Sequence, residues 1–433
     1  MNQARLTIRR RRGERGQTIV LVAVSLVTLL AMAALAVDVV TLYVARSEMQ
    51  RAADAAALAA AKAFVDSGVT SLATTDPNYA AVSGMAQTMA TTVINSILPQ
   101  NKISGITPTL VGAPAFDFTR PGNPQVTVTL QRNNLPTFFS RIWSTSLATV
   151  TASASAEAYN ASGSQTNTGN YVPIAPKCVK PLLVVNQDPK SMAPLIDPVS
   201  GLAAAGVIGE QITLYPACTG TGGVGTCLAI TPSNPPQANV PGPGDLPYIP
   251  AEVTPNANNL CPSCQGASDF EQSIECCDFN TYSCGASTPK INIDTVIRHG
   301  QLRNDTNNGV QCLVNGGARD TLDPASLPDL AAGTGPARIT ANSGPHSGGL
   351  VTTSNSIATL PIIDRTAVAT QVTILGFLQV FIDDSVTVNS PPAGFHTEVQ
   401  AHILNVIGCG SNPSGGNPVS GGGAAIPVRL IHQ

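Results

Sequence analysis

Charged and aromatic residues are scarce in this chain of 433 residues, at 11% and 4% of the total. Such a composition, together with 38 Gly and 34 Pro, suits a loop-rich, β-containing exported protein better than a cytosolic helical enzyme. Basic residues are also few beyond the first fifteen positions. That remaining part of the chain holds 17 of the 23 Lys and Arg residues but 25 of the 26 Asp and Glu residues. Because binding to phosphates needs a net basic face, we expect no nucleic acid among the partners.

Common enzyme motifs are missing as well. The chain contains no G-x-S-x-G, no Walker loop and no H-E-x-x-H, so we expect neither an enzyme nor a cofactor. His396, Glu398 and His402 would share one face of a strand and could converge on a metal, but polar residues on a solvent-exposed face explain them equally. Residues 383–387 (Asp-Asp-Ser-Val-Thr) superficially fit the start of a metal-ion-dependent adhesion site. Only 46 residues follow, so a turn that ends a strand is favoured and no metal site is assigned.

Arginines near the N-terminus precede a long apolar run. Ile19 to Val37 is 19 residues without a charge, interrupted only by Ser25 and Thr28. At ~1.5 Å per residue, a helix of this length crosses the hydrocarbon core of a bilayer once. Because basic residues stay on the cytoplasmic side, we expect a single pass through the inner membrane, a cytoplasmic N-terminus, and periplasmic or extracellular C-terminal domains. The arginines that set this topology are Arg9, Arg10, Arg11, Arg12 and Arg15.

Two kinds of processing remain open for this segment. Residues 34–36 read Ala-Leu-Ala and offer a site for a signal peptidase, although the apolar region of a signal peptide is only about 7 to 15 residues long. Prepilin-type cleavage between Gly16 and Gln17 would instead leave a helix that enters a filament. Pilin-like precursors usually carry Glu five residues after the cleaved bond, where this chain has Leu21.

The helix is expected to continue beyond the membrane. From Gln17 to Asp66 neither Gly nor Pro intervenes and apolar residues recur at near-helical spacing, which predicts one helix of roughly 75 Å. Alanine buries little area and lets backbones approach closely. The alanine-rich second half is therefore predicted to pack against partner helices, including those of a homo-oligomer, with an inert spacer as the alternative. The packing residues are Ala52, Ala53, Ala56, Ala57 and Ala60.

The N-terminal 66 residues follow a distinctive order. A basic cluster leads to Arg15-Gly16-Gln17, then to an apolar run ending in Ala36-Val37-Asp38, then to Leu42-Tyr43 and the alanine-rich segment from Gln50 to Ala61. This order resembles the N-terminus of TadE/TadG-like proteins of the bacterial Tad (Flp) tight-adherence pilus assembly systems. The resemblance implies a single-pass inner-membrane component, pilin-like or pilus-associated, whose partners are other Tad pilus assembly proteins or pilins. It carries over no catalytic residue.

Ten cysteines, an even number, all follow the apolar run. They predict structural disulfides in an oxidising compartment, with a connectivity that the sequence does not determine. Cys261-Pro262-Ser263-Cys264 would also fit a zinc ribbon or a redox pair, but the next pair, Cys276-Cys277, is adjacent and cannot easily place both sulfurs on one tetrahedral metal. The candidates for disulfides are Cys178, Cys218, Cys227, Cys261, Cys264, Cys276, Cys277, Cys284, Cys312 and Cys409.

Periodicity predicts the elements of the remaining chain. A helix starts at Asp76-Pro77 and ends before Pro99, and alternation predicts antiparallel strands around residues 126–130 and over residues 148–158. Further strands are expected at residues 181–185, 371–382 and 399–407, with an edge strand at 427–431. Residues 232–255 contain eight prolines and predict a loop or an extended connection rather than packed structure.

Together these patterns predict an α+β fold. It comprises a single N-terminal transmembrane helix extended into a long helix, a small αβ pilin-like domain and a disulfide-containing β-rich domain. The expected limits are 1–16 for the cytoplasmic basic segment, 17–66 for the helix, 67–160 for the αβ domain, 161–170 for a linker, and 171–433 for the Cys-containing exported domain.

The function expected from the sequence is structural: a membrane-anchored component of a Tad-type pilus that acts through protein-protein contacts. Two alternatives stay open. An exported metal- or thiol-dependent enzyme would require bound metal or free thiols. A cell-surface adhesin or ligand-binding module with a membrane anchor would require a C-terminal domain that binds a surface or a glycan.

Overall fold

The computed structural model divides into two compact units. The first holds residues 1–55, 96–113 and 128–154, and the second holds residues 56–95, 114–127 and 155–433. The α+β class is confirmed by a long apolar N-terminal helix, mixed helices and strands, and disulfides in a β-rich region. The domain limits expected from the sequence stay a prediction. The structure describes residues 14–72, 74, 76–119, 123–135, 148–159, 176–196, 203–217, 244–254, 261–262, 264, 266, 268–277, 282, 290–292, 294, 297, 299–327, 338–364, 371–390, 394–408 and 426–431.

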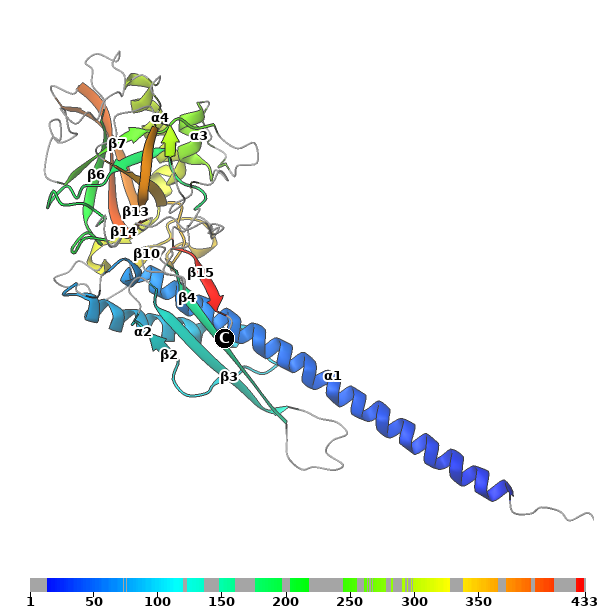
Figure 1. The fold of residues 1–433 in the computed structure, drawn as a ribbon. Helices are drawn as coiled ribbons and strands as arrows, with labels where there is room; N and C mark the ends of the chain where they lie inside the picture. Colours follow the sequence, from blue (N-terminus) through cyan, green and yellow to red (C-terminus); the bar gives the residue numbers. More distant parts are fainter. Residues whose placement is uncertain are drawn as a thin grey trace, which may run out of the picture. The chain divides into compact units, whose positions relative to one another are not determined.

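The longest element is helix α1, which runs from Glu14 to Asp66 (Figure 1). It ends where the sequence changes character. Ser67 Oγ donates a hydrogen bond to the Phe64 carbonyl at 2.7 Å, and Gly68 adopts φ 75°, a left-handed conformation that glycine reaches without strain. The predicted single helix ending at Asp66 is confirmed.

Helix α2 (Tyr79–Ile97) confirms the helix predicted to follow Asp76. It begins later than predicted because Asp76 Oδ1 accepts the backbone N–H of Asn78 at 2.8 Å, in a turn that precedes the helix. One face of α2 is buried at every third or fourth residue, as an amphipathic helix requires. The buried residues are Val82, Ala86, Ala90 and Ile94.

A five-stranded sheet contains both alternating segments predicted from the sequence. Its strand order is β1-β3-β4-β15, and β2 also pairs with β3. Val126, Val128 and Leu130 are fully buried while the residues between them are half-buried, which is the two-residue period of a strand. The strands are β1 (Thr109–Leu110), β2 (Ala115–Asp117), β3 (Gln125–Leu135), β4 (Ala148–Ala158) and β15 (Val428–Ile431).

The predicted edge strand near the C-terminus is β15, and it belongs to this sheet. It pairs antiparallel with β4, from Val428 opposite Ala158 to Ile431 opposite Ser155. Arg429 anchors it, because its Nε lies 2.5 Å from an oxygen of Glu157. The C-terminal strand therefore returns to the sheet that begins near residue 109.

In the described part of the second unit, six strands close into a β-barrel. Their order is β12-β5-β7-β6-β14-β13, and the pairing of β12 with β13 completes the ring. β5 and β12 are parallel, as are β6 and β7, whereas the other neighbours are antiparallel. Closure removes the free edges of these strands. The strands are β5 (Leu182–Val185), β6 (Gln211–Pro216), β7 (Asp245–Pro250), β12 (Ile357–Ile363), β13 (Gln371–Ser390) and β14 (Gly394–Gly408), and β8 (Lys290–Asn292) pairs with the start of β13.

Three barrel strands match predicted segments and one corrects a prediction. β5, β13 and β14 contain the predicted apolar runs, although β13 continues to Ser390 and β14 starts at Gly394. β7 lies in the proline-rich stretch that was expected to be a loop. That expectation rested on proline being unable to donate a hydrogen bond, whereas Leu246, Tyr248 and Ile249 between the prolines are buried and form the strand.

Two helices and a small sheet complete the second unit. α3 spans Asp269–Glu275, and α4 spans His299–Leu313 and packs against β13 and β14. The small sheet, in the order β11-β10-β9, covers a cluster of buried apolar residues that includes Ile339 and Phe381. Its strands are β9 (Thr321–Asp323), β10 (Arg338–Thr340) and β11 (Leu350–Val351). Short 3-10 helices lie at Val69–Ser71, Leu98–Gln100, Gly316–Ala318, Pro324–Ser326 and Gly344–His346.

Candidate functional site

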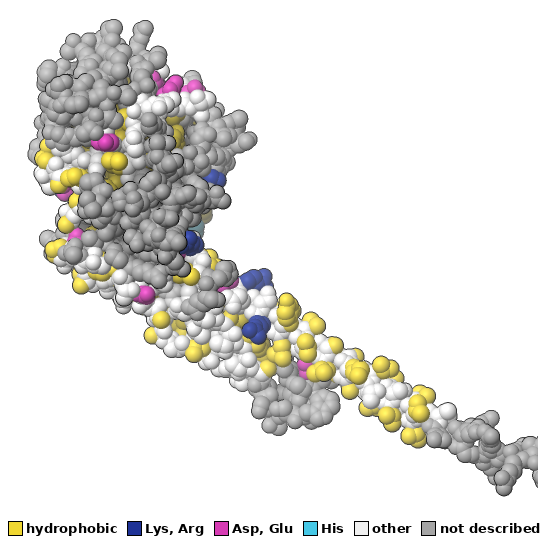
Figure 2. Space-filling view, in the orientation of Figure 1, with side chains coloured by type: hydrophobic (Ala, Val, Ile, Leu, Met, Phe, Trp, Pro, Cys, Tyr) yellow, Lys and Arg dark blue, Asp and Glu magenta, His cyan; other side chains and the backbone are white. Residues whose placement is uncertain are grey.

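The N-terminal half of α1, defined here as Thr18–Val44, exposes its apolar side chains. Most of the large ones are 47–75% exposed, including Leu29 at 64% and Tyr43 at 75%. Figure 2 shows them as hydrophobic side chains along the helix. Among the described residues, α1 is the one helix long and apolar enough to cross a membrane. Exposure of so much apolar surface to water is unfavourable, so this half of the helix has the properties of a membrane anchor.

The expected ends of the membrane span both lie in this exposed half. Ile19 is 70% exposed and Val37 is 49% exposed. Arg9 to Arg12 lie outside the described residues, and the side chain of Arg15 is not described although its backbone is part of α1. The role of these five arginines in topology stays a prediction.

The C-terminal half of α1, Ala45–Asp66, buries the alanines that the sequence singles out. In the first unit this half lies against β4, where Gln50 Nε2 donates to the Ser153 carbonyl at 3.3 Å. The alanines therefore pack inside the protein, and their association with other helices stays a prediction. Their exposed fractions are 2% for Ala52 and 0% for Ala53, Ala56, Ala57 and Ala60.

The segment at the end of α1 is joined to other elements of the second unit. The rings of Phe64 and Phe118 meet edge to face, with centroids 5.3 Å apart. Ser71, which is fully buried, accepts the Val406 backbone N–H at 3.0 Å and lies 3.3 Å from Asn405 Oδ1. These contacts attach the end of the helix segment to the barrel strand β14.

The six described cysteines form three disulfides. The bonds join Cys178 to Cys277, Cys261 to Cys276, and Cys264 to Cys312. The two cysteines of the C-x-x-C spacing thus bond to different partners, and the adjacent pair after α3 also divides between two segments. This connectivity holds α3 and α4 to the loops beside them, which is a structural role. The candidates Cys218, Cys227, Cys284 and Cys409 lie outside the described residues.

The two histidines singled out near the C-terminus form separate pairs. His396 Nε2 lies 3.1 Å from Glu398 Oε1, and His402 Nδ1 lies 2.7 Å from Asp383 Oδ2. Asp383 reaches His402 because it is the extra residue of a β-bulge in β13. Within the described residues, no group of three or more His, Cys, Asp or Glu is placed to hold a metal ion.

The stretch Asp383 to Thr387 corrects a prediction. It was expected to form a turn at the end of a strand, but it lies inside β13, opposite β14. Asp384 and Ser385 both accept hydrogen bonds from Gln311 Nε2 of α4, at 2.8 and 3.0 Å. Its polar residues therefore attach a helix to the barrel.

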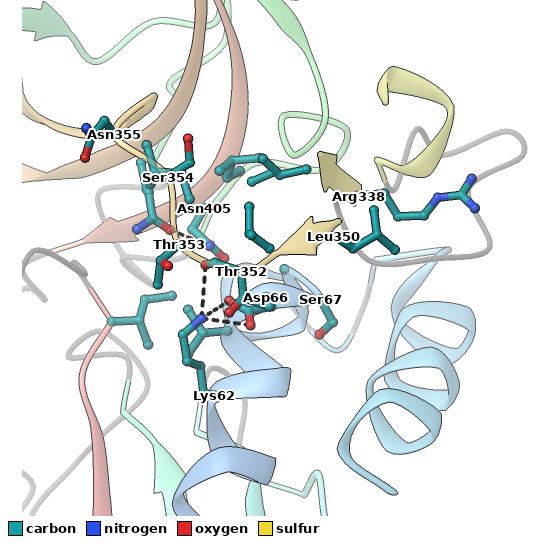
Figure 3. A pocket seen from close by; sticks show the side chains of 18 of the residues that line it. Lys62, Asp66, Ser67, Arg338, Leu350, Thr352, Thr353, Ser354, Asn355 and Asn405 are labelled. Atoms are coloured by element: carbon teal, nitrogen blue, oxygen red, sulfur yellow. Dashed lines mark hydrogen bonds and ion pairs between the residues drawn. The ribbon is translucent and has the colours of Figure 1, made fainter. Parts of the chain in front are cut away.

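A groove of about 1500 Å³ is formed entirely by residues of the second unit. Figure 3 shows Lys62 and Asp66 of α1 beside Thr352 among the residues that line it, with dashed lines from Lys62 to the other two. Lys62 Nζ lies 2.6 and 2.8 Å from the two carboxylate oxygens of Asp66, and 3.5 Å from the Thr352 carbonyl. Met85 and Met89 of α2 line the groove as well.

The groove was not predicted from the sequence, because its lining comes from segments far apart in the chain. One local signal existed: Met85, Met89 and Val93 recur every four residues on α2, off the face that α2 buries. A helix with two apolar stripes has a second surface to cover. Further lining residues come from α1, the small sheet, β13, β14, β15 and the disulfide Cys178–Cys277.

Two buried charged residues also line this groove. Lys180 is 4% exposed, and its Nζ donates to the Cys276 carbonyl at 2.7 Å. Glu275 is 3% exposed; its Oε2 accepts the Gly266 N–H at 2.7 Å, while Oε1 has no hydrogen-bond partner among the described residues. Burial raises the pKa of the Glu275 carboxyl above its ordinary value.

A second perturbed carboxyl lies near β6. Burial, followed by the charge of Asp188, raises the pKa of Glu210 to about 7. Lys190 Nζ lies 3.2 Å from Glu210 Oε1 and lowers this pKa, but by less than the other two causes raise it. Glu210 is therefore a group whose charge depends on pH near neutrality.

The exposed apolar helix, followed by a folded body, defines a protein with a helical membrane anchor. Residues 16–63 match the family described as putative Flp pilus-assembly TadE/G-like. The match covers nearly all of α1, so the resemblance found in the sequence is confirmed there. Comparison with curated proteins and with solved structures found no match.

Proposed function

We propose that this chain is a membrane-anchored structural or assembly component of a Tad (Flp) type pilus and acts through protein-protein contacts. The observation that carries the proposal is that the TadE/G-like match, residues 16–63, coincides with α1 and contains its exposed apolar half. A helix of this kind can anchor a folded domain at a bilayer, and this role requires no catalytic activity.

The proposed topology follows from charge and from cysteine usage. The five N-terminal arginines favour a cytoplasmic N-terminus, and disulfides form and persist in oxidising compartments. We therefore assign α1 to the inner membrane and the segments after it to the periplasm or the cell surface, with the αβ and Cys-containing domains divided near residues 161–170.

The proposed mechanism is mechanical. The exposed half of α1 anchors the protein, the buried half joins the anchor to the folded body, and surfaces of that body bind pilins or other Tad proteins. Disulfides support this role because they stabilise a folded domain against unfolding outside the cell, by about 2–5 kcal/mol each.

Deletion of the gene, with complementation by the full chain, tests the assembly role. We expect loss of piliation and adherence in the deletion and recovery of both on complementation. Unchanged piliation in the deletion would contradict the role. Protease treatment of intact spheroplasts tests the topology separately: the C-terminal part should be degraded without lysis, and degradation only after lysis would reverse the assignment.

A further inference from the structure

We propose that the groove binds an extended apolar segment of a partner polypeptide that carries a basic residue, and that this segment adds as a strand to β11 (Leu350–Val351). This binding goes beyond the pilus role, because it is expected of the purified chain alone and does not depend on pilus assembly. Its failure would leave the membrane-anchored role intact.

The size and lining of the groove indicate a polypeptide. Its volume of about 1500 Å³ is larger than the ~300–1000 Å³ typical of small-molecule sites. Val351, Ile357 and Leu404 are partly buried apolar residues that pack on the core cluster beneath the small sheet and leave one side toward the groove. Met85 and Met89, which also line the groove, are flexible side chains that adapt to different apolar partners.

The rim of the groove carries open strand edges. Among the described residues, β11 pairs only with β10, and β15 pairs only with β4. Leu350, Val351 and Val428 of these two edge strands line the groove. Alternate backbone N–H and C=O groups on an edge point away from the neighbouring strand and need partners. An extended peptide supplies both kinds of group in the right order, whereas a helix uses its own and an acyl chain has none.

The charged side chain of Lys62 lies at the open edge of β11. Lys62 Nζ approaches the Thr352 carbonyl at 3.5 Å while it holds Asp66 at 2.6 Å (Figure 3). A lysine at a strand edge discourages pairing with unsuitable chains. A peptide N–H can replace this long contact, and Lys62 then keeps its ion pair with Asp66. Leu350 is 68% exposed on the same edge, so an added strand covers it.

Glu275 specifies the charge of the occupant. Its Oε1 atom is buried in the groove and has no hydrogen-bond partner among the described residues. Burial raises the pKa of the Glu275 carboxyl by more than the charge of the buried Lys180 lowers it. Because a buried carboxylate oxygen without a donor is costly, a bound ammonium or guanidinium group is favoured there. The occupant is therefore an apolar strand with a lysine or arginine.

Binding of a synthetic peptide to the full chain in lipid nanodiscs tests the proposal. The probe is an acetylated nonapeptide of alternating valine and threonine with lysine at its centre. A second peptide has the same side chains, but its amides are methylated along one edge so that they cannot pair. We expect the first to bind and to protect the amides of Leu350 and Thr352, which face the open edge, from hydrogen exchange. The methylated peptide should bind at least about tenfold more weakly, because it lacks backbone donors.

Two protein variants locate the binding. Leu350→Lys places a charge on the edge and should weaken binding about fivefold or more, whereas Met192→Lys, a matched change at a side chain 49% exposed outside the groove, should leave it unchanged. Replacing the lysine of the probe by norleucine should weaken binding to the native chain but not to Glu275→Gln. Absence of binding, equal binding of the methylated peptide, or equal effects of Leu350→Lys and Met192→Lys would each overturn the proposal.

Discussion

The two halves of α1 differ in what covers their apolar side chains. In the half Thr18–Val44, large residues such as Leu29 are more than half exposed. In the half Ala45–Asp66, the small residue alanine is fully buried at positions such as Ala56. Burial of a large side chain gains more free energy than burial of alanine, so a protein in water alone would favour the opposite arrangement. The chain itself covers the second half, whereas the first half leaves its large apolar side chains uncovered, as the proposed membrane anchor requires.

The largest expected effect comes from charging the exposed half. Leu26→Arg with Leu30→Arg should abolish stable membrane insertion, because each arginine near the centre of a span costs about 3 kcal/mol. The fraction of protein retained in membranes after alkaline extraction measures this. The matched change Arg46→Lys, outside the span, should leave retention unaffected. Full retention of the double variant would contradict a lipid-covered half.

A smaller effect is expected from enlarging the buried half. Ala56→Leu should lower the free energy of unfolding by about 1–3 kcal/mol, because a closely packed position cannot accept the added atoms. Ala59→Leu at a half-buried position is the control and should change it by no more than about 0.5 kcal/mol. Thermal unfolding followed by circular dichroism distinguishes them. Equal melting temperatures for both variants would show that the alanine face is not packed inside the protein.

The attachment of the helix segment to the barrel gives the next effect. Ser71→Ala removes the acceptor of the Val406 N–H and the partner of Asn405. Loss of these two buried hydrogen bonds should cost about 1–2 kcal/mol in total in the free energy of unfolding. Thr74→Ala, outside these contacts, serves as the comparison. If chemical denaturation gives both variants the midpoint of the native chain, Ser71 does not stabilise the attachment to β14.

The smallest effect concerns pH and lies away from α1. The folded pKa of Glu210 is about 7, against an ordinary value of 4.5, so the protonated form is favoured in the folded protein. The stability it contributes is fully present below pH 4.5 and is lost as the pH rises through about 7. The melting temperature of the native chain should therefore fall from pH 5 to pH 8 more than that of Glu210→Gln. Parallel curves would contradict the raised pKa, and membrane retention should not respond in either case.

Much of the fold could be predicted because its signals are local. The absence of Gly and Pro predicted α1, and alternation over residues 126–130 and 148–158 predicted β3 and β4. Closure of the barrel could not be predicted, because the pairing of β12 with β13 and of β6 with β7 depends on contacts between distant segments. β7 was not predicted, because the prolines of this stretch indicated a loop, whereas its strand character depends on the burial of Tyr248 and its neighbours, which the sequence does not show.

The candidate site divides in the same way. The anchor was predictable from one continuous run, Ile19 to Val37, whose side chains are now seen to be exposed. The alanine face was recognised as a packing surface, but only the structure shows that the chain itself covers Ala56 and Ala60. The groove could not be predicted, because Met89 and Val351, which both line it, are far apart in the sequence. Local patterns identify a face to be covered, and the fold decides what covers it.

Photo-crosslinking in native membranes tests the comparison of the two halves most directly. Benzoylphenylalanine is placed at Leu30, 61% exposed in the first half, or at Leu58, half-buried in the second. Irradiation is followed by mass analysis of the purified chain. A lipid covering confined to the first half predicts lipid adducts at Leu30 and none at Leu58. Lipid adducts of equal yield at both positions, or none at Leu30, would contradict it.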